Sequence, residues 1–145
     1  MFKKFSVALV VLAVLCTALP ALADHHKAKI MTKDGIGSYI ADAKGMTLYT
    51  FGKDTMGVSA CAGECIQKWP AYTADKVEPQ AGLNAKDFGS IKRADGTSQV
   101  TFKGMPLYYF FKDQKPGDTN GQGLLGLWNA ANPAGMMPMS MPMMK

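Results

Sequence analysis

The stretch KGMTLYTFGKD at residues 44–54 returns as KGMPLYYFFKD at residues 103–113. The two copies lie 59 positions apart, and eight of their eleven residues are identical. The same offset aligns Trp69 with Trp128. Such agreement within a short chain indicates a duplicated supersecondary unit.

Each copy is preceded by the pattern of a β-hairpin. Asp34-Gly35 and Asp95-Gly96 favour tight turns, because glycine accepts a positive φ without strain. The flanking runs are rich in β-branched and aromatic residues, which suit strands. The expected strands are residues 29–32, 38–43 and 46–51 in the first unit, and 90–93, 98–102 and 105–111 in the second. We therefore predict a mainly β (small α+β) fold, in which two pseudo-repeated β-meander units pack into one domain with a short helical or loop insert.

The third strand of each unit carries the candidate binding residues. Side chains alternate along a strand, so Tyr49 and Phe51 should share a face opposite Leu48. Two interpretations stay open: a core face, or the edge of a shared binding groove. The possible groove consists of Tyr49, Phe51, Asp54, Tyr108, Phe110 and Asp113. The aspartates can instead fix turns by accepting backbone N–H bonds.

The N-terminus predicts export from the cytosol. Lys3 and Lys4 precede an apolar run that ends in Ala21-Leu22-Ala23, which is the pattern of a secretory signal peptide cleaved after Ala23. We therefore expect a periplasmic or secreted protein without a stable membrane anchor. The remaining lysines are scattered, which argues against a nucleic-acid partner.

The 145 residues, of which 48% are hydrophobic, suffice for a single domain with its own core. The expected organisation is a signal peptide at 1–23, an N-terminal segment at 24–34, a two-repeat domain at 35–132 with units at about 35–75 and 94–132, and a flexible Met-rich tail at 133–145.

These motifs resemble a known bacterial family. The doubled Gly-x-x-Leu-Tyr-x-Phe-x-x-Asp, Cys61-x-x-x-Cys65 followed by Trp69-Pro70, and Arg93-x-Asp95-Gly96-x-x-Gln99 are similar to the secreted repeat of unknown function, or predicted lipoproteins with a conserved Tyr-x-(Phe/Trp/Tyr)-x-x-Asp motif. The resemblance implies an extracytoplasmic two-repeat domain and no particular reaction. The chain departs from the lipoprotein members because Leu15, not a small residue, precedes Cys16.

Cys61 and Cys65 form the first candidate chemical site. In an oxidising compartment, two cysteines at this spacing most simply form a disulfide. Disulfide geometry requires Cβ atoms closer than those of residues i and i+4 on a regular helix, so Cys61 should lie in the loop before the helix. The alternative is a dithiol that binds Cu(I) or acts as a redox pair.

The Met-rich tail is the second candidate site. Thioether sulfurs are soft ligands for Cu(I), and Met-x-Met spacing lets neighbouring side chains converge on one ion. The imidazoles of His25 and His26 offer nitrogen ligands near the other end of the mature chain. The candidate metal ligands are Met136, Met137, Met139, Met141, Met143, Met144, His25 and His26. Scavenging of oxidants by methionine is the alternative role.

The sequence therefore predicts a non-enzymatic protein that captures or buffers copper. No histidine lies within residues 30–145 to serve as the base of a nucleophile, and no catalytic residue is assigned. The expected partner is a metal ion. The alternative is an interaction or electron-transfer accessory module that binds another extracytoplasmic protein through the aromatic groove.

Overall fold

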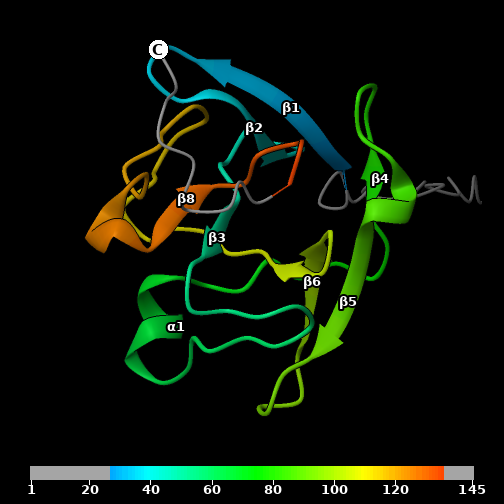
Figure 1. Cartoon of the computed structure of the whole chain (residues 1–145), viewed down its shortest axis with the longest axis vertical. Helices are drawn as coiled ribbons and strands as arrows, with labels where there is room; N and C mark the ends of the chain where they lie inside the picture. Colours follow the sequence, from blue (N-terminus) through cyan, green and yellow to red (C-terminus); the bar gives the residue numbers. More distant parts are fainter. Residues whose placement is uncertain (1–26, 136–145) are drawn as a thin grey trace, which may run out of the picture.

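A computed structural model describes residues 27–135 of the chain, and over this range it is mainly β (Figure 1). The strands form three small sheets, with orders β2-β1-β4, β3-β8 and β5-β6-β7. The elements are β1 Lys27–Lys33, β2 Gly37–Asp42, β3 Tyr49–Phe51, α1 Glu64–Lys68, β4 Glu78–Pro79, the 3-10 helix η2 Ala85–Asp87, β5 Phe88–Lys92, β6 Ser98–Phe102, β7 Met105–Pro106, the 3-10 helix η3 Leu124–Gly126 and β8 Trp128–Ala130.

Both predicted hairpins are present. Strands β1 and β2 pair antiparallel around a turn that contains Gly35 at φ 81°, and β5 and β6 pair around Gly96 at φ 87°. The Asp95 carboxylate accepts hydrogen bonds from the backbone N–H and the hydroxyl of Thr97, which closes the second turn. The local turn chemistry therefore specifies these two elements.

The N-terminal segment expected at residues 24–34 contains the first strand, as the predicted strand at 29–32 indicates. Strand β1 covers Lys27–Lys33 and forms the centre of a sheet. Ala28 is fully buried, and its carbonyl accepts a hydrogen bond of 2.8 Å from Gln80 N. The folded part therefore already includes Lys27.

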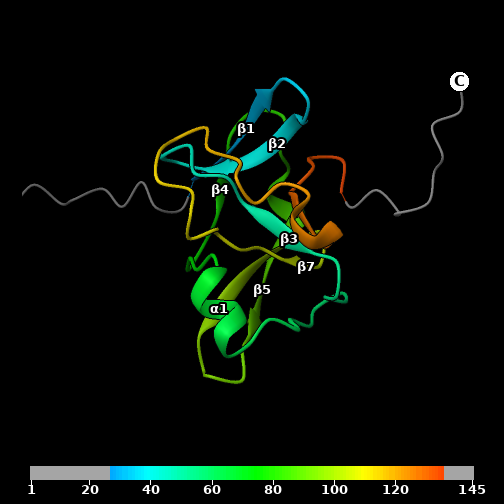
Figure 2. The ribbon, with the colours of Figure 1, turned by 90° about the vertical axis from the view of Figure 1, so that its left-hand side faces the viewer.

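The third strands depart from a simple meander. Leu48 N bonds to Ile40 O in its own hairpin, but the chain then leaves that hairpin, and β3 pairs with β8 of the other unit. Tyr49 and Tyr108 exchange two backbone hydrogen bonds of 2.8 and 3.0 Å. The predicted continuous strands at 46–51 and 105–111 are therefore too long. Figures 1 and 2 both show β3 crossing the middle of the molecule.

Two buried clusters lie on opposite sides of these crossing segments. Tyr49, Phe51 and Tyr108 belong to a largely aromatic cluster, whereas Leu48 and Leu107 belong to a largely aliphatic one. This confirms the predicted alternation of side chains along the third strands. The aromatic cluster contains the candidate site.

The insert after β3 is short and irregular. The predicted short helix is α1, which covers only Glu64–Lys68. The following segment contains the two-residue strand β4 and the 3-10 helix η2, which is capped by the Asn84 side chain. Between residues 27 and 135, no helix has the length and apolar character needed to cross a membrane.

Candidate functional site

Two tyrosine–aspartate pairs connect the two units. The Tyr49 hydroxyl donates a hydrogen bond of 2.6 Å to Oδ2 of Asp113, and the Tyr108 hydroxyl donates one of 2.6 Å to Oδ2 of Asp54. Each hydroxyl thus comes from one unit and each carboxylate from the other. Both tyrosines are fully buried, and the aspartates are buried as well.

The second carboxylate oxygen of each aspartate closes a loop. Oδ1 of Asp54 accepts a hydrogen bond of 2.6 Å from Ala60 N, and Oδ1 of Asp113 accepts one of 2.9 Å from Asn120 N. The predicted turn-fixing role is therefore confirmed. Burial raises the pKa of Asp54, and the hydrogen bonds from Tyr108 and Ala60 oppose this rise.

The tyrosine hydroxyls are held in their neutral form. Burial, followed by the hydrogen bond to the partner aspartate, raises the pKa of both Tyr49 and Tyr108. All six proposed groove residues are buried inside the protein, and the two tyrosines and two aspartates among them form hydrogen-bonded pairs. Their burial favours the core interpretation over the open groove.

A stack of four rings fills the space between the pairs. Trp69 and Trp128 lie face to face, with centroids 3.7 Å apart and planes within 1°. Phe51 extends the stack beyond Trp128 at 4.2 Å, and Phe110 extends it beyond Trp69 at 4.1 Å. The sequence aligned the two tryptophans by their offset, yet it gave no indication that their rings meet.

Arg93 connects the Tyr108–Asp54 pair to the neighbouring loop. Its Nη1 donates hydrogen bonds of 2.7 Å to both Ser59 Oγ and Gln99 Oε1, and its Nη2 donates to the Cys61 carbonyl. Ser59 in turn lies 2.6 Å from the Tyr108 hydroxyl. Sequence reasoning missed this role, although Arg93 and Gln99 stood in the family motif.

The cysteines form the predicted disulfide. Cys61 and Cys65 are bridged, with their Cα atoms 5.3 Å apart. Cys61 is fully buried in the loop before α1, and Cys65 lies on the helix, as the geometric argument required. In this state neither sulfur is a free thiolate, so the dithiol alternative does not describe the folded protein shown here.

A protein-family model matches most of the described chain. The model described as "secreted repeat of unknown function" matches residues 30–87 and again residues 89–132. The chain belongs to this family. Comparison with curated proteins and with solved structures gave no significant match. The family assignment confirms the resemblance seen in the sequence, and it supplies no reaction or ligand.

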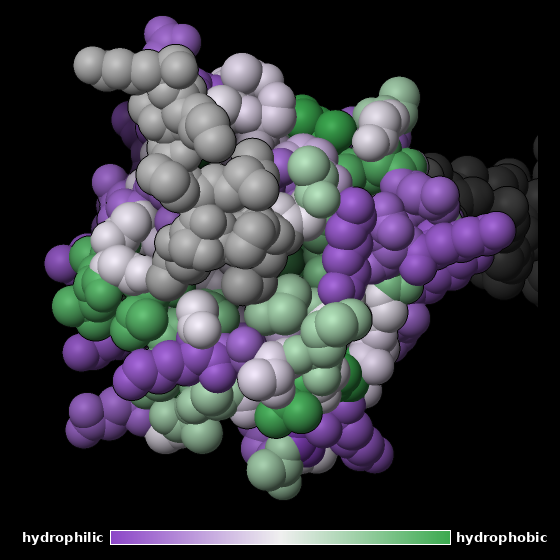
Figure 3. All heavy atoms as spheres, viewed as in Figure 1, coloured by the Kyte–Doolittle hydropathy of each residue, from purple (hydrophilic) through white to green (hydrophobic). Residues whose placement is uncertain are grey.

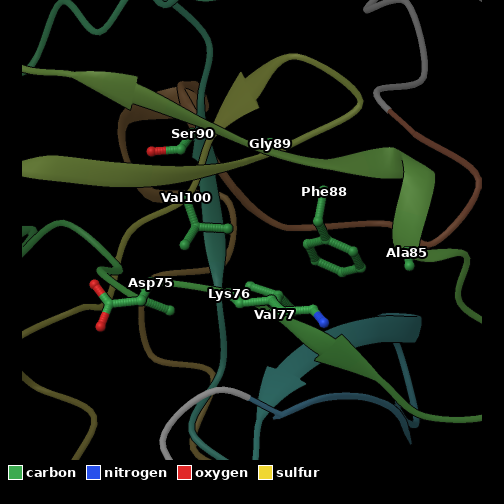
Figure 4. A pocket seen from close by; sticks show the side chains of 9 residues that line it. Asp75, Lys76, Val77, Ala85, Phe88, Gly89, Ser90 and Val100 are labelled. Atoms are coloured by element: carbon green, nitrogen blue, oxygen red, sulfur yellow. The ribbon is translucent and has the colours of Figure 1, made fainter.

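The secreted-repeat domain also has a hollow that the sequence did not predict, here called the β4–β5 hollow (Figure 4). Its volume is about 270 Å³, and most of its wall is apolar. The lining residues are Ala74, Asp75, Lys76, Val77, Ala85, Phe88, Gly89, Ser90 and Val100. The predicted site residues do not contribute to it.

The secreted-repeat domain offers no obvious metal centre of its own. Between residues 27 and 135, no group of three or more His, Cys, Asp or Glu side chains is placed to hold a metal ion. The ligands predicted from the sequence lie outside the described residues; they are His25, His26, Met136, Met137, Met139, Met141, Met143 and Met144.

Proposed function

We propose that this secreted-repeat protein is a periplasmic or secreted, non-enzymatic copper-binding protein that holds Cu(I) through its Met-rich tail. The observation that carries the proposal is the sequence of residues 136–144, where six of nine residues are methionine. Thioethers are soft and pH-insensitive ligands that match Cu(I). A tail selected only for apolar character would not need this near-exclusive use of sulfur.

In this proposal, the folded domain is a stable carrier. The carboxylates of Asp54 and Asp113 are already engaged by tyrosines and backbone N–H groups, and the cysteines are bridged. The candidate ligands inside the core are therefore occupied. The two units act as pseudo-equivalent halves, which the reciprocal Tyr–Asp bonds and the shared offset of the tryptophans support.

The proposed compartment, outside the cytosol, suits both the disulfide and the thioether ligands. A signal peptide removed after Ala23 would deliver the protein to an oxidising compartment, where the Cys61–Cys65 disulfide persists. Thiol ligands would be lost to oxidation there, whereas methionine still binds Cu(I). Thioethers are consequently a suitable choice for copper capture outside the cytosol.

The direct test is competition for Cu(I) against a chromophoric chelator. We expect replacement of the six methionines of residues 136–144 by leucine to weaken Cu(I) binding by about tenfold or more, which corresponds to about 1.4 kcal/mol. Leucine keeps the apolar character of the tail and removes only its sulfur. The matched control is Met56→Leu, because Met56 is 75% exposed but lies outside the tail.

Equal Cu(I) affinity of the wild-type and the tail variant would refute the proposal. Peroxide treatment of copper-free protein then examines the scavenger alternative. That alternative expects faster sulfoxide formation in the tail than at Met56, as measured by mass spectrometry.

An interaction module is the second candidate function, and exposed apolar side chains favour it. Leu125 is 82% exposed and holds φ 55°, which is unusual for a leucine, and Phe111 is 50% exposed. Figure 3 shows green, hydrophobic surface at the left of the view, where η3 lies in Figure 1. Leu125→Ser should then reduce binding to an extracytoplasmic partner in co-purification without lowering stability.

A further inference from the structure

The aromatic core joins two tyrosines through two tryptophans. The ring centroids of Tyr49 and Trp69 lie 5.4 Å apart, and those of Trp128 and Tyr108 lie 5.2 Å apart. Between these two contacts, the indoles of Trp69 and Trp128 are stacked with centroids 3.7 Å apart. Each step from one tyrosine to the other is therefore a direct contact between rings.

The two indoles overlap more fully than isolated aromatic rings favour. Ring quadrupoles make an offset or edge-to-face arrangement better than a face-to-face sandwich. Trp69 and Trp128 nevertheless lie face to face, with their planes within 1° of each other. If one of two overlapping indoles loses an electron, the positive charge spreads over both rings, so the stack is easier to oxidise than a single indole. An electron can therefore leave the core from this stack.

Each tyrosine at the end of the row has a base for its proton. A tyrosine gives up an electron readily only when its hydroxyl proton leaves as well, because the oxidised phenol is a strong acid. The acceptors are Oδ2 of Asp54 for Tyr108 and Oδ2 of Asp113 for Tyr49, both at 2.6 Å. Burial raises the pKa of Asp54, which makes its carboxylate a better proton acceptor. The proton can move along a hydrogen bond that already exists.

The charges in the core favour an oxidised tyrosine over an oxidised tryptophan. A buried charge is costly, and a tryptophan that has lost an electron holds a positive one. A hydrogen-bonded Tyr–Asp pair carries one negative charge before oxidation. After it has lost an electron and moved its proton, it consists of a neutral radical and a neutral carboxylic acid. The oxidising equivalent should therefore pass from the indoles to the tyrosines.

A short row of rings connects this core to the surface. Phe111 is 50% exposed, and its centroid lies 5.2 Å from that of Phe110, which stacks on Trp69 at 4.1 Å. Electrons tunnel readily through contacts of this kind, so an oxidant at Phe111 does not need to reach the buried rings. Trp69 and Trp128 are only 4% and 2% exposed, and they are shielded from direct attack.

We propose that the aromatic core is a one-electron relay for strong one-electron oxidants, such as oxygen-centred radicals. The oxidant takes one electron from the Trp69–Trp128 stack and is reduced by that electron. Tyr49 or Tyr108 then returns one electron to the stack, while its hydroxyl proton passes to the bonded aspartate. The products are a neutral tyrosyl radical and a protonated carboxyl group. This inference goes beyond copper binding, because it uses only residues of the folded domain.

Flash photolysis of the full, copper-free protein tests the relay, with photogenerated tris(bipyridine)ruthenium(III) as the oxidant. Transient absorption distinguishes the tryptophan radical from the tyrosyl radical. In the wild type, the tryptophan signal should decay as the tyrosyl signal appears. The double variant Tyr49→Phe/Tyr108→Phe should lose most of the fast tyrosyl signal and keep its tryptophan radical for longer. An unchanged tyrosyl signal in this variant would overturn the inference.

The Tyr109–Asp42 pair supplies a matched control. The Tyr109 hydroxyl also donates a hydrogen bond to a carboxylate, Oδ2 of Asp42, at 2.8 Å. Its ring, however, meets that of Tyr72 and packs against the aliphatic cluster. Tyr109→Phe should therefore leave the fast tyrosyl signal intact. Equal losses in Tyr109→Phe and in the double variant would show that contact with the tryptophans is irrelevant, and would overturn the relay.

The proton transfer gives a second readout, which a purely structural role would not change. Asp54→Asn/Asp113→Asn should slow formation of the tyrosyl radical by about a hundredfold, because a positioned base is lost. Asp42→Asn is the control and should leave the rate unchanged. In the wild type, after exchange of the hydroxyl protons, the tyrosyl radical should form more slowly in D₂O than in H₂O. Equal rates in the two solvents would overturn the inference, and this measurement needs no substitution.

Discussion

The Tyr108–Asp54 and Tyr49–Asp113 regions use the same hydrogen bond in different surroundings. Both hydroxyl-to-carboxylate distances are 2.6 Å. The Tyr108 hydroxyl also meets Ser59, which Arg93 holds, and the adjoining loop carries the disulfide. The Tyr49 hydroxyl instead accepts a bond of 3.2 Å from Gly121 N.

The loop at Asp113 is closed without a covalent bond. Asp118 accepts hydrogen bonds from the backbone N–H groups of Gln114 and Lys115, and Lys33 Nζ donates to Gly117 O and Thr119 Oγ1. The repeated motif thus fixes the buried pair in both regions, while each loop is closed by its own means. The two units therefore share the buried Tyr–Asp hydrogen bond, and they differ in how the surrounding loops are closed.

The largest expected loss of stability follows from replacing a tryptophan of the ring stack, which lies between the two regions. We expect Trp69→Ala and Trp128→Ala each to lower the free energy of unfolding by about 3–5 kcal/mol, because each removes a buried aromatic ring from the core. Chemical denaturation measures both losses. A loss below about 1 kcal/mol for either variant would show that the stack does not contribute substantially to the stability of the core.

Removal of the disulfide should lower stability more than a change at the matching position of the other region. The variant Cys61→Ala/Cys65→Ala should lose about 2 kcal/mol of stability, since the bridge closes a very short loop. The matched control is Asn120→Ala, because Asn120 stands 59 positions after Cys61 and its exposed side chain makes only a bond of 3.3 Å to Lys112 O. Equal losses in both variants would contradict the covalent role assigned to the first region.

Removal of the tyrosine hydroxyls should lower stability by a smaller amount, and in both regions. Tyr49→Phe and Tyr108→Phe should each cost about 1–2 kcal/mol, because a buried carboxylate oxygen loses its hydrogen-bond donor. Tyr108→Phe should cost more, because it also breaks the 2.6 Å contact with Ser59, whereas Tyr49→Phe also breaks only the longer bond of 3.2 Å from Gly121 N. Tyr39→Phe is the control, because the buried Tyr39 hydroxyl contacts only the weak acceptor Met31 Sδ, at 4.0 Å. A larger loss at Tyr39 would contradict this account.

The stability of the protein should fall gradually as the pH becomes alkaline. Burial raises the pKa of Tyr49, Tyr108 and Tyr109, and raises that of Tyr72 to about 12. A raised folded-state pKa means that stability is complete below the unfolded value near 10 and falls as the pH rises above it. Each such tyrosine should contribute a slope of up to about 1.4 kcal/mol per pH unit.

Tyrosinate absorbance and circular dichroism, followed together against pH, measure this coupling. The buried tyrosines should ionise only as the sheet signal is lost. Ionisation of all tyrosines at their ordinary pKa, with the sheet signal intact, would contradict the burial argument. Tyr49→Phe and Tyr108→Phe should each reduce the pH dependence by a similar amount.

Local features of the fold could be predicted from the sequence. Asp34-Gly35 and Asp95-Gly96 gave both hairpins because glycine φ values select the turn. The spacing of Cys61 and Cys65 gave the disulfide and its placement at the helix start. The alternation of Leu48 and Tyr49 gave the two faces of the third strand. In each case the signal lies within a few neighbouring residues.

The exchange of strands between the units could not be predicted. Because the two copies are nearly identical, pairing of residues 46–51 within a unit and across units satisfies the same pattern. The Trp69–Trp128 stack and the Arg93 network both join residues of the two units, so their geometry could not be predicted either. Only the equal offset of the tryptophans and the position of Arg93 in the motif hinted at a shared role.

The crossing of β3 to β8 has a consequence for the origin of the molecule. A polypeptide carrying one unit alone would leave its central segment without a neighbour and half of the ring stack unfilled. A second identical polypeptide could supply both, so the simplest ancestor is an intertwined homodimer. Fusion of its two genes would then have produced a single chain in which each half completes the other.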